Sequence, residues 1–297
     1  MNVVVQYGAY PFVLVFGIAL HDVLLAIHLG VHVATYLPVI VGACIVAGLE
    51  WIYPYRQQWW ADKQDMLQDA MYLVLIQGVL PKLLAVSVMF TLSQVLDEHD
   101  FVVEGWWPSH WPVPFQMLIM MVVADGLRYW LHRWAHEWEP LWRFHAVHHS
   151  PQKLYWLNVG RFHPIDKGLQ VFLDTLPFLF LGVGEEVLGL YVVCYAINGF
   201  FQHGNVDLRL GLLNYLISGP ELHRWHHSMV KQESNHNYGN NLIIWDLLFG
   251  TWYLPTEREV QELGLVNRVY PSAFLQQMTI PFVSGADRQT VESGLSP

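Results

Sequence analysis

The chain has 297 residues, enough for one large domain or two small ones. Hydrophobic residues make up 54% of it and charged residues only 13%, about half the charged fraction of an average soluble domain. The net charge is -10, with 15 Lys and Arg in total. This composition excludes a nucleic-acid-binding protein, because such binding depends on clustered basic residues. With only Cys44 and Cys194, a disulfide framework and a cysteine-based metal site are excluded as well.

Long apolar runs predict an all-α protein that crosses a membrane, because a helix needs about 20 apolar residues to span a bilayer. Four runs approach this length, at residues 10–27, 33–52, 70–95 and 115–131. A fifth run, at residues 169–201, is broken at Pro177 and again at residues 182–186. It predicts two short helices that form a hairpin or a re-entrant pair.

The distribution of basic residues predicts the orientation of these spans. The segments that follow the first and third spans carry no Lys or Arg, whereas Arg56 and Lys63 follow the second, and five basic residues follow the fourth by residue 167. Both termini and the histidine-rich region are therefore expected in the cytoplasm. Lys82 is the exception inside the third run, and we expect a kink at Pro81 that lets its amine reach water or a carbonyl.

Eleven of the sixteen histidines fall between residues 132 and 236. Eight of them form three clusters, which are His132 with His136, HAVHHS at 145–150 and HRWHHS at 223–228. Spacings of three and four residues bring side chains to one face of a helix, and neutral imidazole is the commonest protein ligand for transition metals. The clusters therefore predict a metal site.

The repeated His-x-x-His-His pattern predicts two metals rather than one. Its first and third histidines are four residues apart, and the middle one points slightly to the side, so each copy can reach two ions. Eight imidazoles also exceed the four ligands of one tetrahedral ion. Among the other histidines, His203 is the best candidate for a further ligand, and His163 either binds metal or organises the site with Arg161.

Two carboxylates are candidates for orienting the metal ligands. A metal-bound histidine usually donates its second N–H to a carboxylate or carbonyl, and Asp125 lies seven residues before His132 on the same helix face. Asp125 is equally consistent with a polar group that faces other helices. We regard Asp246 as a second candidate for the same role, and we expect His236 to cap a turn.

The residue types favour iron. Imidazole suits iron, zinc, copper and nickel, but the chain lacks the HExxH motif of zinc proteases and the two Glu-x-x-His motifs of ferritin-like di-iron proteins. A histidine-rich, carboxylate-poor centre that faces a membrane fits iron performing oxygen chemistry on a lipid.

These motifs resemble those of the fatty acid hydroxylase and sterol desaturase superfamily of integral-membrane di-iron enzymes. The similarity extends over nearly the whole chain. It is carried by residues 125–136, the two HxxHH boxes, RFHP at 161–164, FQHGN at 201–205 and NYGNNLIIWDLLFGTW at 237–252. The resemblance implies membrane helices and a cytosolic helical cap that holds the metals.

The resemblance also implies two iron ions, O2 as co-substrate and attack on an unactivated C–H bond, although family members carry zinc when purified. It implies metal ligands at nine positions, which are His132, His136, His145, His148, His149, His203, His223, His226 and His227. Gly199 stands where some members have a further histidine, so one metal is expected to have one ligand fewer or to use water.

We therefore predict transmembrane helices in residues 1–131, a catalytic cap in 132–255 that includes a membrane-associated hairpin at 169–203, and a cytosolic tail in 256–297. The predicted activity is hydroxylation of a fatty acyl, sterol or related lipid in a bacterial inner membrane. Electrons would come from a separate ferredoxin- or cytochrome b5-like protein. Desaturation and ether-lipid oxidation use the same site and stay open, whereas non-enzymatic metal handling is disfavoured because the clusters lie outside the apolar runs.

Overall fold

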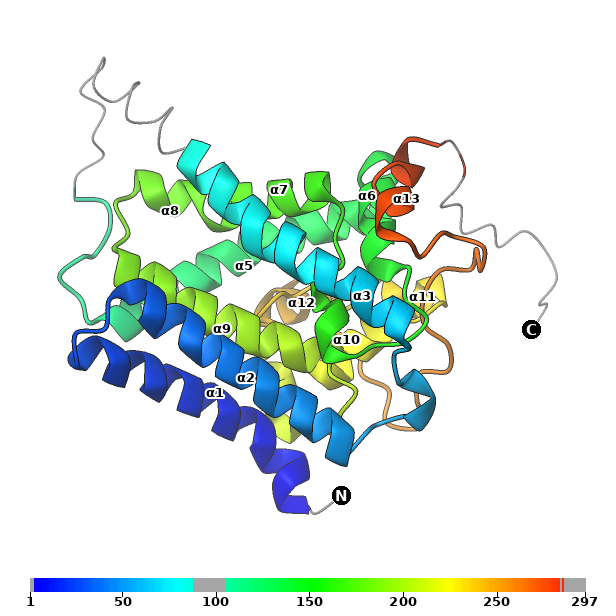
Figure 1. The fold of residues 1–297 in the computed structure, drawn as a ribbon, viewed down its shortest axis with the longest axis horizontal. Helices are drawn as coiled ribbons and strands as arrows, with labels where there is room; N and C mark the ends of the chain where they lie inside the picture. Colours follow the sequence, from blue (N-terminus) through cyan, green and yellow to red (C-terminus); the bar gives the residue numbers. More distant parts are fainter. Residues whose placement is uncertain (1–2, 88–104, 284, 286–297) are drawn as a thin grey trace.

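The computed structural model describes residues 3–87, 105–283 and 285, and it consists of helices (Figure 1). Within these residues, β-pairing is limited to isolated bridges, such as the one between Pro54 and Val206. The all-α prediction is therefore confirmed. The predicted tail after residue 284 and the end of the third apolar run, residues 88–95, lie outside the described residues.

Three helices in the described part of the chain are long and apolar enough to cross a membrane. They are α1 (Val3–Ala26), α2 (Val31–Ile52) and a continuous helix Lys63–Ser87, which contains α3 (Lys63–Met71) and the π-helical segment η2 (Tyr72–Val79). Less than a third of each apolar window is buried inside the protein. Most of these side chains are therefore free to face lipid.

The fourth predicted span lies within α5 (Val113–Glu137), which does not have the composition of a membrane span. Its side chains Gln116, Asp125 and Arg128 are polar and buried against the rest of the protein. The described residues therefore give three candidate spans instead of the predicted four. One face of α5 is buried, whereas Phe115, Leu118 and Val123 on the helix are exposed.

In the two turns before Pro81 the third span is π-helical rather than α-helical, and the kink expected at Pro81 stays a prediction. Proline has no backbone N–H and disrupts the preceding turn, and the eight residues before Leu80 form a π-helix in which the Leu80 N–H donates to the Leu75 carbonyl. The Lys82 ammonium lies 4.5 Å from the centre of the Tyr36 ring. The lysine is thus accommodated by a cation–π contact rather than by a carbonyl.

The broken run at 169–201 forms three helices instead of two short ones. They are α7 (Pro164–Asp174), α8 (Leu176–Phe180) and α9 (Glu185–His203), with breaks at Thr175 and around Gly182. Gly182 has φ of +73°, a left-handed conformation that glycine adopts without a steric cost. The interruptions were predicted correctly, but the last arm is a 19-residue helix and most of its residues are buried.

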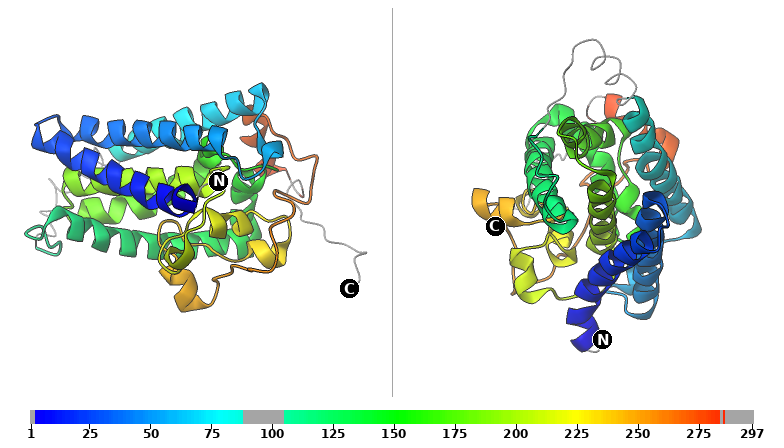
Figure 2. Two further views of the ribbon diagram at one scale, coloured as in Figure 1. Left: turned by 90° about the horizontal axis from the view of Figure 1, so that it is seen from below. Right: turned by 90° about the vertical axis from the view of Figure 1, so that its left-hand side faces the viewer.

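Helix α9 is the centre of the fold. Figure 2 shows it between the layer formed by the three apolar helices and α5 on the opposite side, and it contacts α1, α2, α5 and α10. Short helices lie in the middle and at the right-hand end of the molecule in Figure 1. They are α6 (Glu139–His149), η3 (Trp156–Gly160), α10 (Pro220–His226), α11 (Lys231–Ser234), α12 (Ile244–Phe249) and α13 (Phe274–Gln277).

Glu50 ties the second span to the short elements. Its Oε1 atom accepts from the backbone N–H of Trp156 at 2.6 Å and from that of Asn205 at 2.7 Å. Trp156 begins η3, and Asn205 follows the end of α9. One buried carboxylate therefore joins three segments that are far apart in sequence.

Glu50→Ala should lower the thermal unfolding midpoint by several degrees, because each buried donor left without a partner costs about 1–3 kcal/mol. Glu50→Gln keeps the accepting oxygen and should stay close to wild type. Intrinsic fluorescence melting of the detergent-solubilised protein measures both variants. Equal midpoints for wild type and Glu50→Ala would contradict the linking role.

Candidate metal centre

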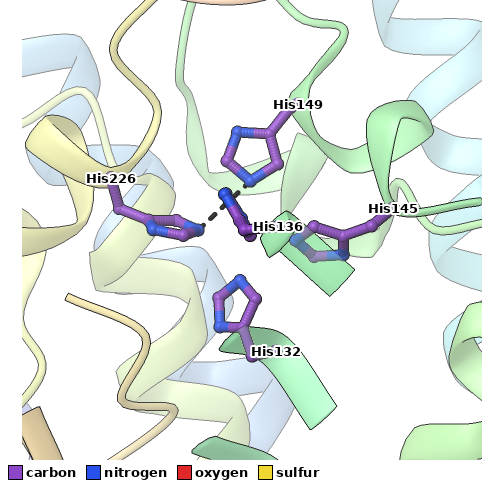
Figure 3. Close-up of side chains that lie close together, drawn as sticks. All are labelled: His132, His136, His145, His149 and His226. Atoms are coloured by element: carbon purple, nitrogen blue, oxygen red, sulfur yellow. Dashed lines mark hydrogen bonds between the residues drawn. The ribbon is translucent and has the colours of Figure 1, made fainter. Parts of the chain in front are cut away.

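Nine histidine side chains converge in two buried groups. The five-histidine group consists of His132, His136, His145, His149 and His226, and the four-histidine group consists of His148, His203, His223 and His227. Within each group, the candidate ligand nitrogens lie within 4.8 Å of one another. Figure 3 shows the five rings of the first group pointing toward a common centre.

The two HxxHH boxes cross between the groups in the predicted way. In α6, His145 and His149 join the five-histidine group, whereas His148 between them joins the other. In and just after α10 the assignment is reversed, because His223 and His227 share one group and His226 turns to the other. The rings of His149 and His227 stack at 4.4 Å between centroids, so the two groups adjoin.

The nitrogen spacing fits a pair of bound metal ions. Ligands about 2.0–2.1 Å from a metal lie roughly 2.9–3.4 Å from each other for right-angled to tetrahedral arrangements. The Nε2 atoms of His149 and His226 are 3.1 Å apart. In the second group, His223 Nε2 is 3.1 Å from His203 Nε2 and 3.0 Å from His227 Nε2.

Outer contacts orient the rings so that Nε2 faces inward. The Nδ1 atom of His132 lies 2.8 Å from the Tyr238 carbonyl, and that of His226 lies 2.8 Å from the His236 carbonyl. His148 Nδ1 lies 3.2 Å from the Arg161 carbonyl. A carbonyl only accepts, so Nδ1 carries the proton and Nε2 keeps the lone pair that a metal requires.

Side-chain acceptors complete this arrangement. His203 Nδ1 lies 2.8 Å from Asn158 Oδ1, and His136 Nδ1 lies 3.3 Å from Asn235 Oδ1. The Nε2 atoms of His132, His136 and His145 are buried without any partner. Since buried polar atoms are normally satisfied, these inward nitrogens are suited to binding a metal ion.

Asp166 is the carboxylate that contacts the histidines. Its Oδ2 lies 2.8 Å from His145 Nδ1, and its Oδ1 accepts from Gln170 at 3.0 Å. Burial raises the pKa of Asp166, but His145 and these hydrogen bonds outweigh burial and hold the pKa below its usual value. An ionised carboxylate at this position makes the imidazole a stronger ligand.

Burial also keeps the imidazoles neutral. It lowers the pKa of His203 and His226 to about 3, and neighbouring imidazoles contribute. The pKa values of His132, His148 and His223 are well below the usual value for the same two reasons. Metal binding requires unprotonated imidazole, so no proton has to be displaced from these ligand nitrogens near neutral pH.

Asp125 and Asp246 do not contact any histidine in the described structure. Asp125 accepts from the backbone N–H of Asn241 and Leu242, and Asp246 accepts from those of Tyr238 and Gly239. The expectation that either would accept a histidine N–H was therefore wrong. Both carboxylates instead hold the segment around Tyr238, whose carbonyl orients His132.

His163 lies outside both groups. Its Nδ1 accepts from the Ile165 N–H as the N-cap of α7, which leaves Nε2 to donate to the Met278 carbonyl at 3.2 Å. The role in organising the site belongs to its neighbour Arg161, whose carbonyl contacts His148 and whose guanidinium lies 2.5 Å from Asp69 on α3.

The contacts of Asp166, Asn158 and Asn235 were not predicted. None has a fixed spacing to its histidine, since these partners are 21, 45 and 99 residues away. Only Asp166 could have been found from the sequence as a partner of a histidine, because it is a carboxylate in the first turn of the helix that follows the RFHP motif.

A cavity of about 460 Å³ connects the histidines to the apolar helices. Helix α2 forms one wall of the cavity with Tyr36, Val39, Ile40 and Cys44. The inner end of the cavity is lined by His132, His145, His148, His203 and His223. Residues from both histidine groups therefore face one shared space.

The fold and site define a helical protein with three candidate membrane spans and a buried, histidine-rich candidate metal centre. Comparisons with known proteins agree, because residues 117–251 match the family model described as fatty acid hydroxylase. The chain belongs to the fatty acid hydroxylase family. It is an oxidoreductase of the lipid hydroxylase type in a family of di-iron enzymes.

Three relatives illustrate the range of this family. Ornithine lipid hydroxylase OlsE from Rhizobium tropici is 35% identical over 80% of this chain and 72% of its own length. Human alkylglycerol monooxygenase is 30% identical over 52% of this chain and 34% of its own length. Methylsterol monooxygenase 2-2 from Arabidopsis thaliana is 26% identical over 48% of this chain and 54% of its own length. No solved structure matches the chain significantly.

Asp166→Asn should weaken metal retention about 10- to 100-fold, the usual effect of removing an outer carboxylate. Competition with a chelator, followed by elemental analysis, measures the affinity. Glu137→Gln is the matched control, because Glu137 is exposed and pairs with Arg133 on the outer surface of α5. Unchanged affinity in Asp166→Asn would contradict the assigned role.

Proposed function

We propose that this protein inserts one oxygen atom of O2 into a C–H bond of a polar membrane lipid, with two iron ions held by the five- and four-histidine groups. The nine histidines are the proposed ligands, and residues 132–255 are the proposed catalytic cap. The observation that carries the proposal is the cavity that joins a lipid-facing helix to both histidine groups.

The cavity suits an acyl chain that arrives from the bilayer. Cys44 and Ile40 are exposed on a candidate membrane span and also line the cavity. Further inside, Val159, Phe162 and Phe200 provide apolar walls that lead to the histidines. Such walls exclude water from the reacting carbon and hold a flexible chain in place.

The metals, when bound, would supply oxygen activation, and the protein supplies the positions of the ligands. Asp166 and the outer carbonyls keep His132, His145, His148 and His226 in one tautomer. The asymmetry between the groups has a consequence, because Gly199 leaves the second group with four histidines. A site with fewer protein ligands keeps a coordination position open, and Gly199 itself lines the cavity.

The relatives suggest which lipid to test first. An ornithine-containing lipid is the first substrate to test, because that class is named for OlsE, which matches most of both chains. The bacterial origin of OlsE supports a bacterial inner membrane with the histidines on the cytoplasmic side. Electrons would come from a separate ferredoxin- or cytochrome b5-like protein.

Membranes from cells that express the protein should contain a lipid that is heavier by one oxygen than its precursor, and His148→Ala should abolish it. Untargeted lipid mass spectrometry measures both. His32→Ala is the matched control, because His32 is exposed and outside both groups. A lipid lighter by two hydrogens would instead identify a desaturase, and a cleaved ether lipid would identify an ether-lipid monooxygenase.

Cys44→Trp should reduce lipid oxidation at least severalfold while leaving metal content unchanged, because the larger side chain fills the cavity where it meets the bilayer. Product formation and elemental analysis measure the two quantities. Val15→Trp on α1 is the control, since Val15 is exposed but does not line the cavity. Equal loss of activity in both variants would argue against entry beside α2.

A further inference from the structure

The cavity is not uniformly apolar beside the histidines. Gln170 of α7 and Asn240 of the segment before α12 both line it. Leaving the histidines aside, the only buried polar side-chain atoms without a partner that belong to described cavity residues are Gln170 Oε1 and Asn240 Nδ2. Buried polar atoms in native proteins are normally satisfied, so these two point to a ligand.

The partners of Gln170 determine which of its atoms is free. Its Nε2 atom donates to Asp166 Oδ1 at 3.0 Å, while the other carboxylate oxygen accepts from His145. The amide cannot be turned around, because its oxygen would then face a carboxylate oxygen. Gln170 is only 3% exposed, so its Oε1 is a buried acceptor with no access to bulk water.

In Asn240 the amide oxygen is held and the amide nitrogen is free, the reverse of Gln170. Its Oδ1 accepts from the Arg128 guanidinium at 3.3 Å, and Arg128 is fixed by Asp174 at 2.5 Å. A guanidinium only donates, so the amide nitrogen must point away from it. Asn240 Nδ2 is therefore a donor whose orientation is set by an ion pair. The cavity thus offers one acceptor and one donor, each on a side chain that cannot flip.

We infer that Gln170 and Asn240 recognise a secondary amide in the lipid substrate, with the substrate N–H donating to Gln170 Oε1 and its carbonyl accepting from Asn240 Nδ2. Among the linkages that join acyl chains to headgroups, the amide both donates and accepts, whereas esters and ethers only accept. This inference rests on the proposed lipid hydroxylation and names the substrate class that the same cavity selects.

The placement of Gln170 has a consequence for the position of oxidation. Gln170 binds Asp166, and Asp166 binds His145, so the amide lies two side chains away from the five-histidine group. The oxidised carbon should therefore lie within a few bonds of the amide. The far end of a long acyl chain is expected to remain unmodified.

Lipid binding in nanodiscs tests the inference without turnover. The probes are two brominated lipids of equal length that differ only in a secondary amide or an ester linkage, and quenching of tryptophan fluorescence gives their dissociation constants. Wild type should bind the amide about tenfold more tightly, the usual effect of one buried hydrogen bond. Equal binding of the two probes would overturn the inference.

Two variants should separate the two hydrogen bonds. Gln170→Leu should weaken binding of the amide to the level of the ester and leave the ester unaffected. Asn240→Asp keeps the acceptor for Arg128 and removes the donor, so it should weaken both probes equally, because both have a carbonyl. Gln77→Leu, which removes another cavity-lining amide, should leave the ratio unchanged. Equal weakening of both probes by Gln170→Leu would contradict the assignment.

Two further measurements complete the design. Circular dichroism and metal content establish that Gln170→Leu is folded and loaded, since Gln170 contacts Asp166. A third probe, an ester with a hydroxyl beside the linkage, should bind like the plain ester, and binding as tight as the amide would overturn the amide assignment. If the amide is preferred but no lipid is oxidised, the proposed hydroxylase function fails while the binding site stands.

Discussion

The burial of nine converging imidazoles is the constraint on which the rest of this structure depends. Each ring must lose water, avoid protonation and keep one nitrogen lone pair directed inward. For six of the nine rings the protein provides an acceptor at Nδ1. These acceptors are the carbonyls of Arg161, His236 and Tyr238, the amides of Asn158 and Asn235, and the carboxylate of Asp166. A hydrogen bond at Nδ1 selects the tautomer that leaves Nε2 free for metal.

The outer acceptors connect the metal centre to the fold. Arg161 orients His148 through its carbonyl and is anchored to the third span through Asp69. Asp125 and Asp246 fix the segment around Tyr238. They position His132 indirectly, because the Tyr238 carbonyl contacts His132 Nδ1. Loss of either carboxylate would release a backbone segment, whereas loss of Asp166 would remove a side chain that contacts a histidine directly.

The helices that bury the histidines also line the cavity beside them. Helix α9 lies between the apolar helices and α5 (Figure 2) and carries His203 at its end. Small residues on the spans allow this close packing, since a side chain at Gly42 would meet Ile197 of α9 at 2.8 Å. The cavity is lined by Ile40 and Cys44 of α2, which are exposed on a candidate membrane span, and it reaches both histidine groups.

The sequence by itself determined the helical class, three of the spans, the family and the histidines that form the site, because helical periodicity and box spacing are local properties of the chain. It also predicted that the middle histidine of each box turns to the other group. Only the tertiary structure showed that one face of the helix at 115–131 is buried together with the polar side chains Asp125 and Arg128, since its contacts with α7 and α9 are invisible in hydropathy. The contacts of Asp166, Asn158, Gln170 and Asn240 likewise depend on helices that meet across long sequence separations, and no local pattern encodes such meetings.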